Sequence, residues 1–362
     1  MRQPTTNRSL DTARRMAVAL GIGLGLLGFS ARPAAAQAPP RLADTGLYRD
    51  FAGRAIAPAI FAYTPQYPLW SDGATKRRWI LLPAESSIDA SDPGAWVFPV
   101  GTKFWKEFSF GRAVETRYME RTAGGWIFAT YRWSEDGSDA VLAPEQGVRG
   151  AAEIRPGVRH DLPSRWDCGA CHEGQPTPVL GFSALQLSTD RDPLAPNAET
   201  PRPGDLDLAK LIERGLVRGL PAEWKKTPPR IIARSPRERA ALGYLAANCA
   251  HCHNAVGPLA NVGMSLAVRL VASHQSREAL TTAVGQPSRY RLPGGKDTLR
   301  VAAGDPDHSL LALRMASREP LLQMPPLGTK VADQEALDLI RAWIQEREPA
   351  AEVLIAFQSV KI

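Results

Sequence analysis

The chain has few of the residues that cross-link proteins or bind metals through soft atoms. Its 362 residues include four cysteines, six histidines and six methionines. This is far below the cysteine content of a disulfide-dense scaffold, about 8–10% of a short chain. Because sulfur and imidazole ligands are so scarce, each candidate can be considered individually.

Long apolar runs are also scarce. The one pronounced run, 16–30, follows a stretch with four arginines and is too short to span a bilayer comfortably. Three alanines at 34–36 then provide small residues for cleavage. We therefore predict a signal peptide over 1–36, export to the periplasm and no stable membrane span in the mature chain.

Charge of one sign is not in strong excess once that segment is removed. The formal charge of the whole chain is +7, and residues 1–36 hold five arginines against one aspartate, which leaves about +3. Nucleic-acid binding requires a clustered basic face, which the sequence does not indicate. We expect no nucleic-acid partner.

All four cysteines lie in two CxxCH motifs, at 168–172 and 249–253. CxxCH is the attachment signature of c-type haem, in which two thiols hold the porphyrin and the histidine binds the iron. The sequence therefore predicts two covalently bound c-type haems. The residues predicted to attach them and to bind iron are Cys168, Cys171, His172, Cys249, Cys252 and His253.

Zinc binding, thiol redox chemistry and disulfides are the alternatives for these cysteines. Zinc ribbons separate their two CxxC halves by about 15–20 residues, whereas the first cysteines of these motifs lie 81 positions apart. A thioredoxin-like pair requires a βαβ context that neither motif has. Two small disulfides would leave the adjacent histidines without a role. Haem attachment accounts for all six residues.

Hydrophobic patterning predicts an α+β multidomain protein, with an antiparallel β-rich domain at 37–160 followed by mainly α haem-binding regions. Six of the nine tryptophans fall between 60 and 145, and apolar residues there alternate with polar ones. A first haem segment is predicted over 161–232, with a proline-rich linker or surface loop near 193–203. Helices are predicted over 205–216, 236–247 and 333–346, and they make 233–362 a class I cytochrome c-like domain.

The second haem has a clear candidate for its sixth ligand. Met324 precedes Pro325 just before the last predicted helix, and proline holds the preceding residue in an extended conformation. Met264 and Met315 are rivals. The carbonyl of Pro258 is a candidate partner for the free ring nitrogen of His253, and His251 is expected at the surface.

The sixth ligand of the first haem is open. The twenty residues after His172 contain no methionine or histidine. Either a residue distant in the sequence is the sixth ligand of this iron, or the sixth coordination position is open. The more distant candidates are His160, Met119, His274, Lys106 and, less favourably, His308. Lys106 is unusual because it alternates onto one strand face with Phe104 and Phe108, where an apolar residue is expected. The favoured interpretation is that the alternation breaks here and that the Lys106 amine extends to solvent.

These residues give the chain a resemblance to a family of uncharacterised proteobacterial dihaem c-type cytochromes, in which an aromatic β-domain precedes CxxCH segments. The matching stretches are YPLWSDGATKRRWILLP, FPVGTKFWKEFSF, VETRYMERTAGGWIFATYRWSEDGSDA, PSRWDCGACH, LGFSALQLS and MPPLGT. The chain is also similar to small lysine-crosslinked c-type cytochromes that oxidise hydroxylamine. That second resemblance implies a five-coordinate first haem and draws attention to Lys103 and Lys106.

The expected function is electron transfer through two haems in the periplasm, with a dehydrogenase or another cytochrome as redox partner. The alternative is a haem enzyme, peroxidase-like or acting on small nitrogen compounds. In that enzyme the first haem would be open and the second would relay electrons. A third hypothesis makes the β-domain a binding module for a partner or small ligand.

Overall fold

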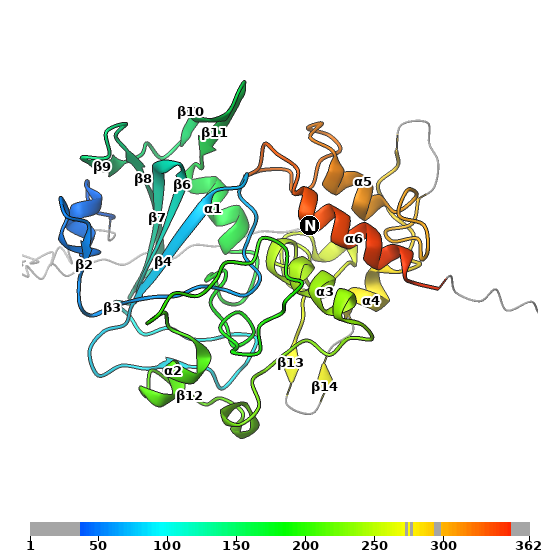
Figure 1. The fold of residues 1–362 in the computed structure, drawn as a ribbon, viewed down its shortest axis with the longest axis horizontal. Coiled ribbons are helices and arrows are strands. Elements are labelled where there is room, and N and C mark those ends of the chain that lie inside the picture. Colours follow the sequence, from blue (N-terminus) through cyan, green and yellow to red (C-terminus); the bar gives the residue numbers. More distant parts are fainter. Residues whose placement is uncertain (1–36, 272–273, 276–277, 293–297, 349–362) are drawn as a thin grey trace, which may run out of the picture. The chain divides into compact units, whose positions relative to one another are not determined.

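A six-stranded antiparallel sheet forms the centre of the protein in this computed structural model (Figure 1). The structure describes residues 37–271, 274–275, 278–292 and 298–348, so the predicted signal peptide lies outside the described residues. The sheet order follows the chain order: β3 (Ile60–Ala62), β4 (Thr75–Leu81), β6 (Lys103–Phe110), β7 (Arg112–Thr122), β8 (Gly125–Trp133) and β9 (Ala140–Leu142). The prediction of an antiparallel β-rich region is confirmed.

One face of the sheet is an aromatic core. Alternating residues of β4, β6, β7 and β8 place Trp79, Trp105, Tyr118 and Tyr131 on this face, all nearly inaccessible to solvent. The short 3-10 helix Leu42–Thr45 covers them. Burying several large aromatic side chains together contributes strongly to stability.

The opposite face is mixed, and charged side chains lie across its middle. The strand register places Arg78 of β4, Lys106 of β6, Arg117 of β7 and Thr130 of β8 directly opposite one another in a single row. We call this the charged face. The neighbouring row on this face is apolar. It consists of Ile80 of β4, Phe104 of β6, Met119 of β7 and Phe128 of β8.

The predicted first haem segment returns to the sheet rather than forming a separate body. Phe182, Leu206 and Leu211 pack into one core with the apolar part of the charged face. Strand β12 (Val217–Arg218) pairs in parallel with β5 (Ile88–Asp89). Residues 193–203 form an irregular and largely exposed loop, which agrees with the surface-loop alternative of the prediction. Buried Ala195 and the ion pair of Glu199 with Arg78 attach this loop to the rest of the fold.

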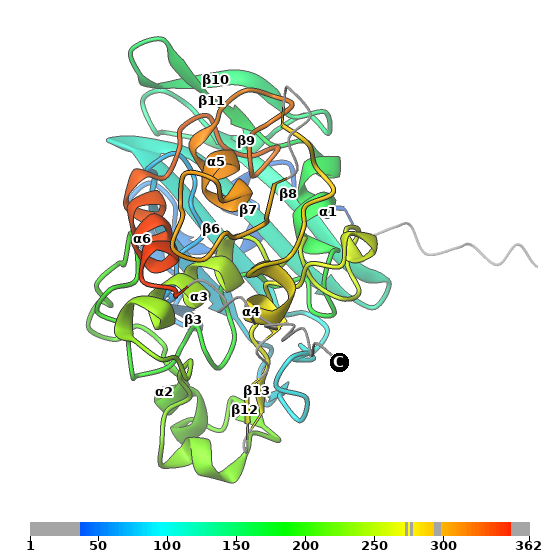
Figure 2. The same ribbon diagram turned by 90° about the vertical axis from the view of Figure 1, so that its right-hand side faces the viewer.

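Helices dominate the C-terminal part of the described chain, so the protein is of mixed α+β class. In Figure 1 α3, α5 and α6 gather to one side of the sheet, and in Figure 2 they lie in front of it. Helix α6 packs on both α3 and α5 through a core that includes Leu245, Ile340 and Trp343. The helices are α1 (Arg165–His172), α2 (Leu208–Glu213), α3 (Pro236–Asn248), α4 (Glu278–Ala283), α5 (Leu310–Ala316) and α6 (Gln334–Gln345). Short 3-10 helices span Ala222–Lys225 and Ala260–Val262.

The remaining strands form small two-stranded sheets: β1 (Tyr48–Asp50) with β2 (Ala55–Ile56), β10 (Val148–Arg155) with β11 (Val158–Leu162), and β13 (Leu270–Val271) with β14 (His274–Gln275). Among the described residues, no helix combines the length and apolar character needed to cross a bilayer. The described residues belong to one compact unit. The domain boundaries at 160 and 232 therefore stay predictions.

Candidate functional site

The first CxxCH motif is helical. Ser164 caps the N-terminus of α1 by accepting from the Asp167 backbone N–H, and the Asp167 carboxylate accepts from the Ser164 N–H. The helical spacing puts Cys168 and Cys171 about one turn apart on the same helix face. Helix α1 lies against β8, where the Thr130 side chain is beside the Cys168 thiol.

His172 is the last residue of this helix, and a hydrogen bond determines which of its ring nitrogens carries the proton. Its Nδ1 lies 2.6 Å from the carbonyl oxygen of Pro178. A carbonyl only accepts, so Nδ1 carries the proton and the Nε2 lone pair is free to bind a metal. The ring also lies 5.2 Å from that of Phe128. Burial lowers the pKa of His172 to about 4, so the imidazole is neutral.

The second motif begins where α3 ends. The backbone N–H groups of Cys252 and His253 both donate to the Cys249 carbonyl, which forms a tight turn. Burial lowers the pKa of His253 to about 4, with Arg314 nearby adding to the effect. The Nδ1 of His253 is buried and has no hydrogen-bond partner in the described chain, so the expected contact with Pro258 is not formed.

The two motifs, far apart in sequence, touch each other. Asn254 Nδ2 donates to the Gly174 carbonyl at 2.8 Å, and Cys252 Sγ lies 3.9 Å from the Ala170 carbonyl oxygen. A Cβ at position 174 would lie 2.3 Å from the His251 carbonyl oxygen, so this close approach requires glycine. Both motifs therefore belong to a single site.

The expectation that His251 is a surface residue was wrong. His251 is 7% exposed because the segment after the first motif packs over it. Burial lowers its pKa to about 4, and the Lys106 amine adds to this. Its Nδ1 has no hydrogen-bond partner among the residues that the structure describes.

The four thiols are not joined in disulfides. Burial raises the pKa of all four, to about 11 for Cys171 and about 12 for Cys249. A redox-active CxxC pair has the opposite property, a thiol with a lowered pKa. Within the described ranges, no three histidine, cysteine or acidic side chains gather as a metal site.

Met324 lies in the loop between α5 and α6. Its backbone N–H donates to the Arg314 carbonyl at 2.9 Å, and the charge of Arg314 acts on His253. The end of this loop is tied to the β-region, since Asp72 accepts from the backbone N–H of Val331 at 2.9 Å. Hydrogen bonds therefore hold this loop both at Met324 and at Val331.

The rival and distant ligands have different environments. Met315 is buried in the helical core, and Met264 packs against that core. Met119 is buried on the charged face, opposite Phe128 in the strand register. The exposed His308 bonds Asp305 through Nδ1 at 2.6 Å. His274 is in β14, and its side chain lies outside the described residues.

His160, the candidate nearest to the first motif in sequence, has both ring nitrogens engaged. Nε2 lies 3.0 Å from the Glu115 carboxylate and Nδ1 lies 3.6 Å from that of Asp72. Burial alone would lower the pKa of His160, but its hydrogen bonds to Asp72 and Glu115 raise it to about 9. A protonated imidazole has no lone pair for iron. His160 is thus a structural cation in this arrangement.

We predict that this buried His160 network makes stability fall at alkaline pH. Its pKa is about 9 when folded and about 6.5 when unfolded. The stabilisation is therefore complete below pH about 6.5 and is lost as the pH rises through 9, on the order of 3 kcal/mol in total. Urea unfolding at pH 6 and pH 9.5 measures this loss. His160→Gln keeps hydrogen-bonding capacity without titrating. An equal pH dependence in this variant would contradict the prediction.

Sequence reasoning identified Lys106 but missed its neighbours on the charged face. Lys106 is half-buried, and the protein atoms around its amine lower its pKa well below the usual value. Lys76 is 8% exposed, and burial lowers its pKa to about 8. Extending the period-two pattern to β4 would have placed Lys76 and Arg78 on the same face.

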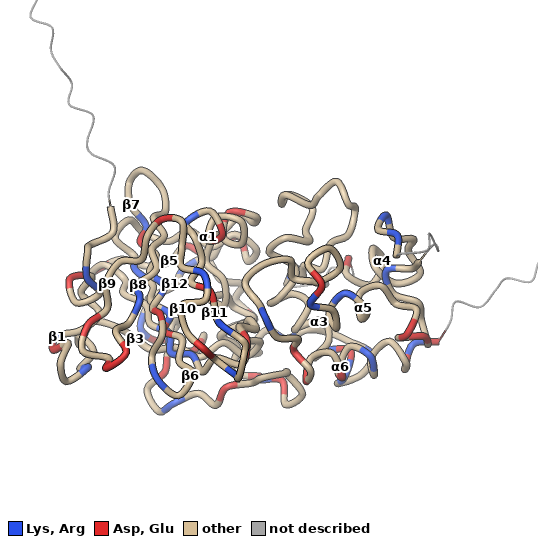
Figure 3. Tube along the Cα trace, turned by 90° about the horizontal axis from the view of Figure 1, so that it is seen from above, with Lys and Arg blue, Asp and Glu red and all other residues tan. Residues whose placement is uncertain are grey.

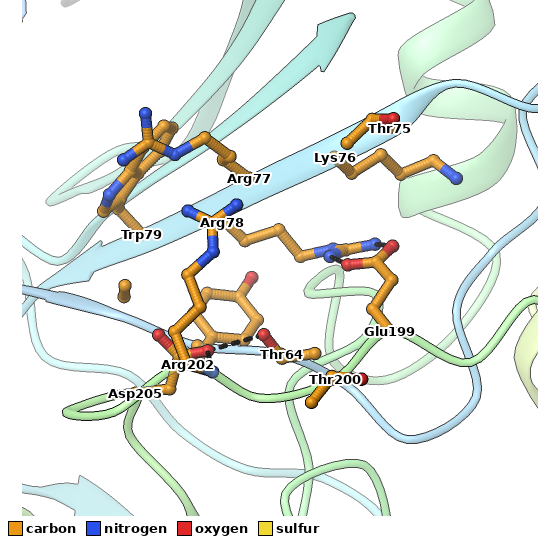
Figure 4. Close-up of a pocket in the computed structure, with 12 residues that line it drawn as sticks. Thr64, Thr75, Lys76, Arg77, Arg78, Trp79, Glu199, Thr200, Arg202 and Asp205 are labelled. Atoms are coloured by element: carbon orange, nitrogen blue, oxygen red, sulfur yellow. Dashed lines mark hydrogen bonds and ion pairs between the residues drawn. The ribbon is translucent and has the colours of Figure 1, made fainter.

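A separate small cavity of about 130 Å³ opens beside the free edge of β4 (Figure 4). Arg78 and Glu199 form a two-bonded ion pair at its rim, at 2.6 and 3.0 Å. In Figure 4 the Lys76 amine lies clear of that pair. The cavity is lined by Ala62, Tyr63, Thr64, Thr75, Lys76, Arg77, Arg78, Trp79, Glu199, Thr200, Arg202 and Asp205, none of them a motif residue.

The site as a whole fits covalent haem. Each motif offers two unpaired thiols and one neutral histidine, which is the donor set that attachment and iron binding require. The carbonyl of Pro178 orients the first histidine for a metal. In comparisons with known proteins, no family model, no curated protein and no solved structure matches this chain.

Proposed function

We propose that this protein is a periplasmic dihaem c-type cytochrome that exchanges electrons with a redox partner protein, a dehydrogenase or another cytochrome. The observation that supports it best is the pair of touching CxxCH motifs with unpaired thiols and neutral histidines. A c-type haem at each motif would supply reversible one-electron iron chemistry. The residues proposed to hold the two haems are Cys168, Cys171, His172, Cys249, Cys252, His253 and Met324.

Hydrogen bonds within the chain orient the residues that are proposed to hold the haems. Pro178 holds the His172 ring in one tautomer and raises its basicity through the Nδ1 hydrogen bond. Asn254 clamps the second motif onto the segment after the first. Lys and Arg are interspersed with Asp and Glu along the described trace (Figure 3), whereas nucleic-acid binding requires a clustered basic face.

A second function, a haem enzyme with an open first iron position, is favoured by one observation. His160, the nearest sixth ligand in sequence, is occupied by Glu115 and Asp72 on both ring nitrogens. Without a sixth protein ligand, iron beside His172 would accept a small molecule. This arrangement would suit peroxidase-like chemistry or chemistry on small nitrogen compounds.

Carbon monoxide separates the two functions. For an electron-transfer protein with both irons fully ligated, we expect no fast CO binding to the dithionite-reduced native protein. Rapid binding of one CO per chain would instead favour the enzyme. A pyridine haemochrome assay on the same sample should count two haems per chain. A purified, folded protein without haem would contradict both functions.

A further inference from the structure

The charged face carries more positive charge than its own carboxylates balance. Arg78, Lys106 and Arg117 are direct cross-strand neighbours, and Lys76 lies two residues before Arg78 on the same face. Like charges placed opposite one another in a sheet are destabilising. Such a row of like charges is stable only where opposite charges, from the protein or from a ligand, compensate the repulsion.

Two of the four cations have carboxylate partners. Arg78 pairs with Glu199 at 2.6 Å, and Arg117 pairs with Glu115 at 2.7 Å. Lys76 and Lys106 have no hydrogen bond or ion pair to any residue that the structure describes. The Lys106 amine lies 5.1 Å from the centre of the Phe108 ring, a contact much weaker than a carboxylate would provide. Neither ammonium group is therefore directly paired with a carboxylate of the described chain, and only the more distant carboxylate charges of Glu199 and Asp333 act on them.

Lys106 and Arg117 lie near the first motif, because their row ends at β8, which contacts α1, and the charge of Lys76 acts on Lys106 from the neighbouring strand. The charge of Arg117 acts on both Cys168 and Cys171, and that of Lys106 acts on His172. The cations therefore face the helix that would carry the first haem. Leaving a buried charge unpaired costs several kcal/mol, so the residues here are suited to an anionic ligand.

We propose that Lys76 and Lys106 are the counter-ions of the two propionate carboxylates of the haem attached at Cys168 and Cys171. This inference rests on the proposed function. A haem brings two carboxylates to a site that has two unpaired ammonium groups, and no bond is made or broken beyond two ion pairs. It gives Lys106 a role as a positioning residue and removes it from the candidates for the sixth iron ligand.

The test uses the holoprotein with Lys76→Met and Lys106→Met, which remove the charge and keep the length of the side chain. We expect shifted propionate bending modes in the resonance Raman spectrum and a lower midpoint potential for one haem, because a lost cation favours ferric iron. Lys106→Arg should restore values close to wild type. Lys103→Met is the matched control, since Lys103 lies on the opposite face of β6 and donates to the Thr45 carbonyl.

Three outcomes would overturn the inference. In the first, propionate modes and potentials stay at wild-type values in both methionine variants. In the second, Lys103→Met moves them equally. In the third, Lys106→Met changes the iron spin state while the propionate modes stay unchanged, which would make Lys106 an axial ligand. In each case the haem count of two per chain would still stand, whereas a wild-type protein without haem would refute the proposed function itself.

Discussion

Replacing Cys168 and Cys171 together by alanine is expected to halve the haem content, from two haems per chain to one. In the proposed function each motif attaches its own haem through its own two thiols, so losing one pair would remove one attachment site. The Cys249→Ala/Cys252→Ala double variant should also retain one haem. The pyridine haemochrome assay and the mass of the denatured chain measure both results.

The matched control is His308→Ala, which removes an exposed histidine outside both motifs and should leave two haems. The spectra of the two double variants should differ, because the variant that keeps the second motif would retain the haem for which Met324 is the proposed ligand. Two haems remaining in either double variant would refute covalent attachment at that motif. Bound zinc in place of haem would refute the assignment altogether.

Met324→Ala is expected to abolish the methionine-to-iron charge-transfer band of the ferric protein. It should also lower one midpoint potential by an amount on the order of 100 mV. Thioether ligation favours ferrous iron, and axial ligands set haem potentials over a range of roughly 0.8 V. The loop position of Met324, anchored to α5 and tied near its end to Asp72, is consistent with a fixed ligand. Visible spectroscopy and a spectroelectrochemical titration provide the two measurements.

Met264→Ala provides the comparison, because Met264 is the rival that packs against the helical core without being fully buried. Its replacement should leave the band and both potentials unchanged. A band that survives Met324→Ala and disappears in Met264→Ala would assign the ligand to Met264. Met315→Ala is less informative, since Met315 is buried and its loss would leave a cavity.

Local signals in the sequence predicted local structure well. Helix α3 begins at Pro236, as predicted, with Ser235 as its N-cap. Helix α6 begins one residue after the predicted start, because Asp333 is its N-cap. These features depend on residues only a few positions apart, which is why the sequence was sufficient. The favoured break of the alternation at Lys106 was wrong, because the strand register is continuous there and Lys106 shares a face with Phe104 and Phe108.

Distant contacts were not predictable in the same way. The Pro178 carbonyl bonded to His172, the two carboxylates around His160 and the burial of His251 all depend on how separate segments meet. The composition of the proline-rich stretch near 193–203 indicated a linker or surface loop but not the part of the fold that this loop contacts. The partner of Glu199, Arg78, is 121 residues away.

The sequence by itself determined the mixed α+β character, the starts of α3 and α6 and the positions of the two CxxCH motifs, because residue spacing and capping act over a few residues. Only the tertiary structure decided that the motifs touch, that His160 is bound to carboxylates, and that a row of cations faces the first motif. Those outcomes depend on which surfaces are buried against each other, and burial is a property of the packed chain rather than of any short segment.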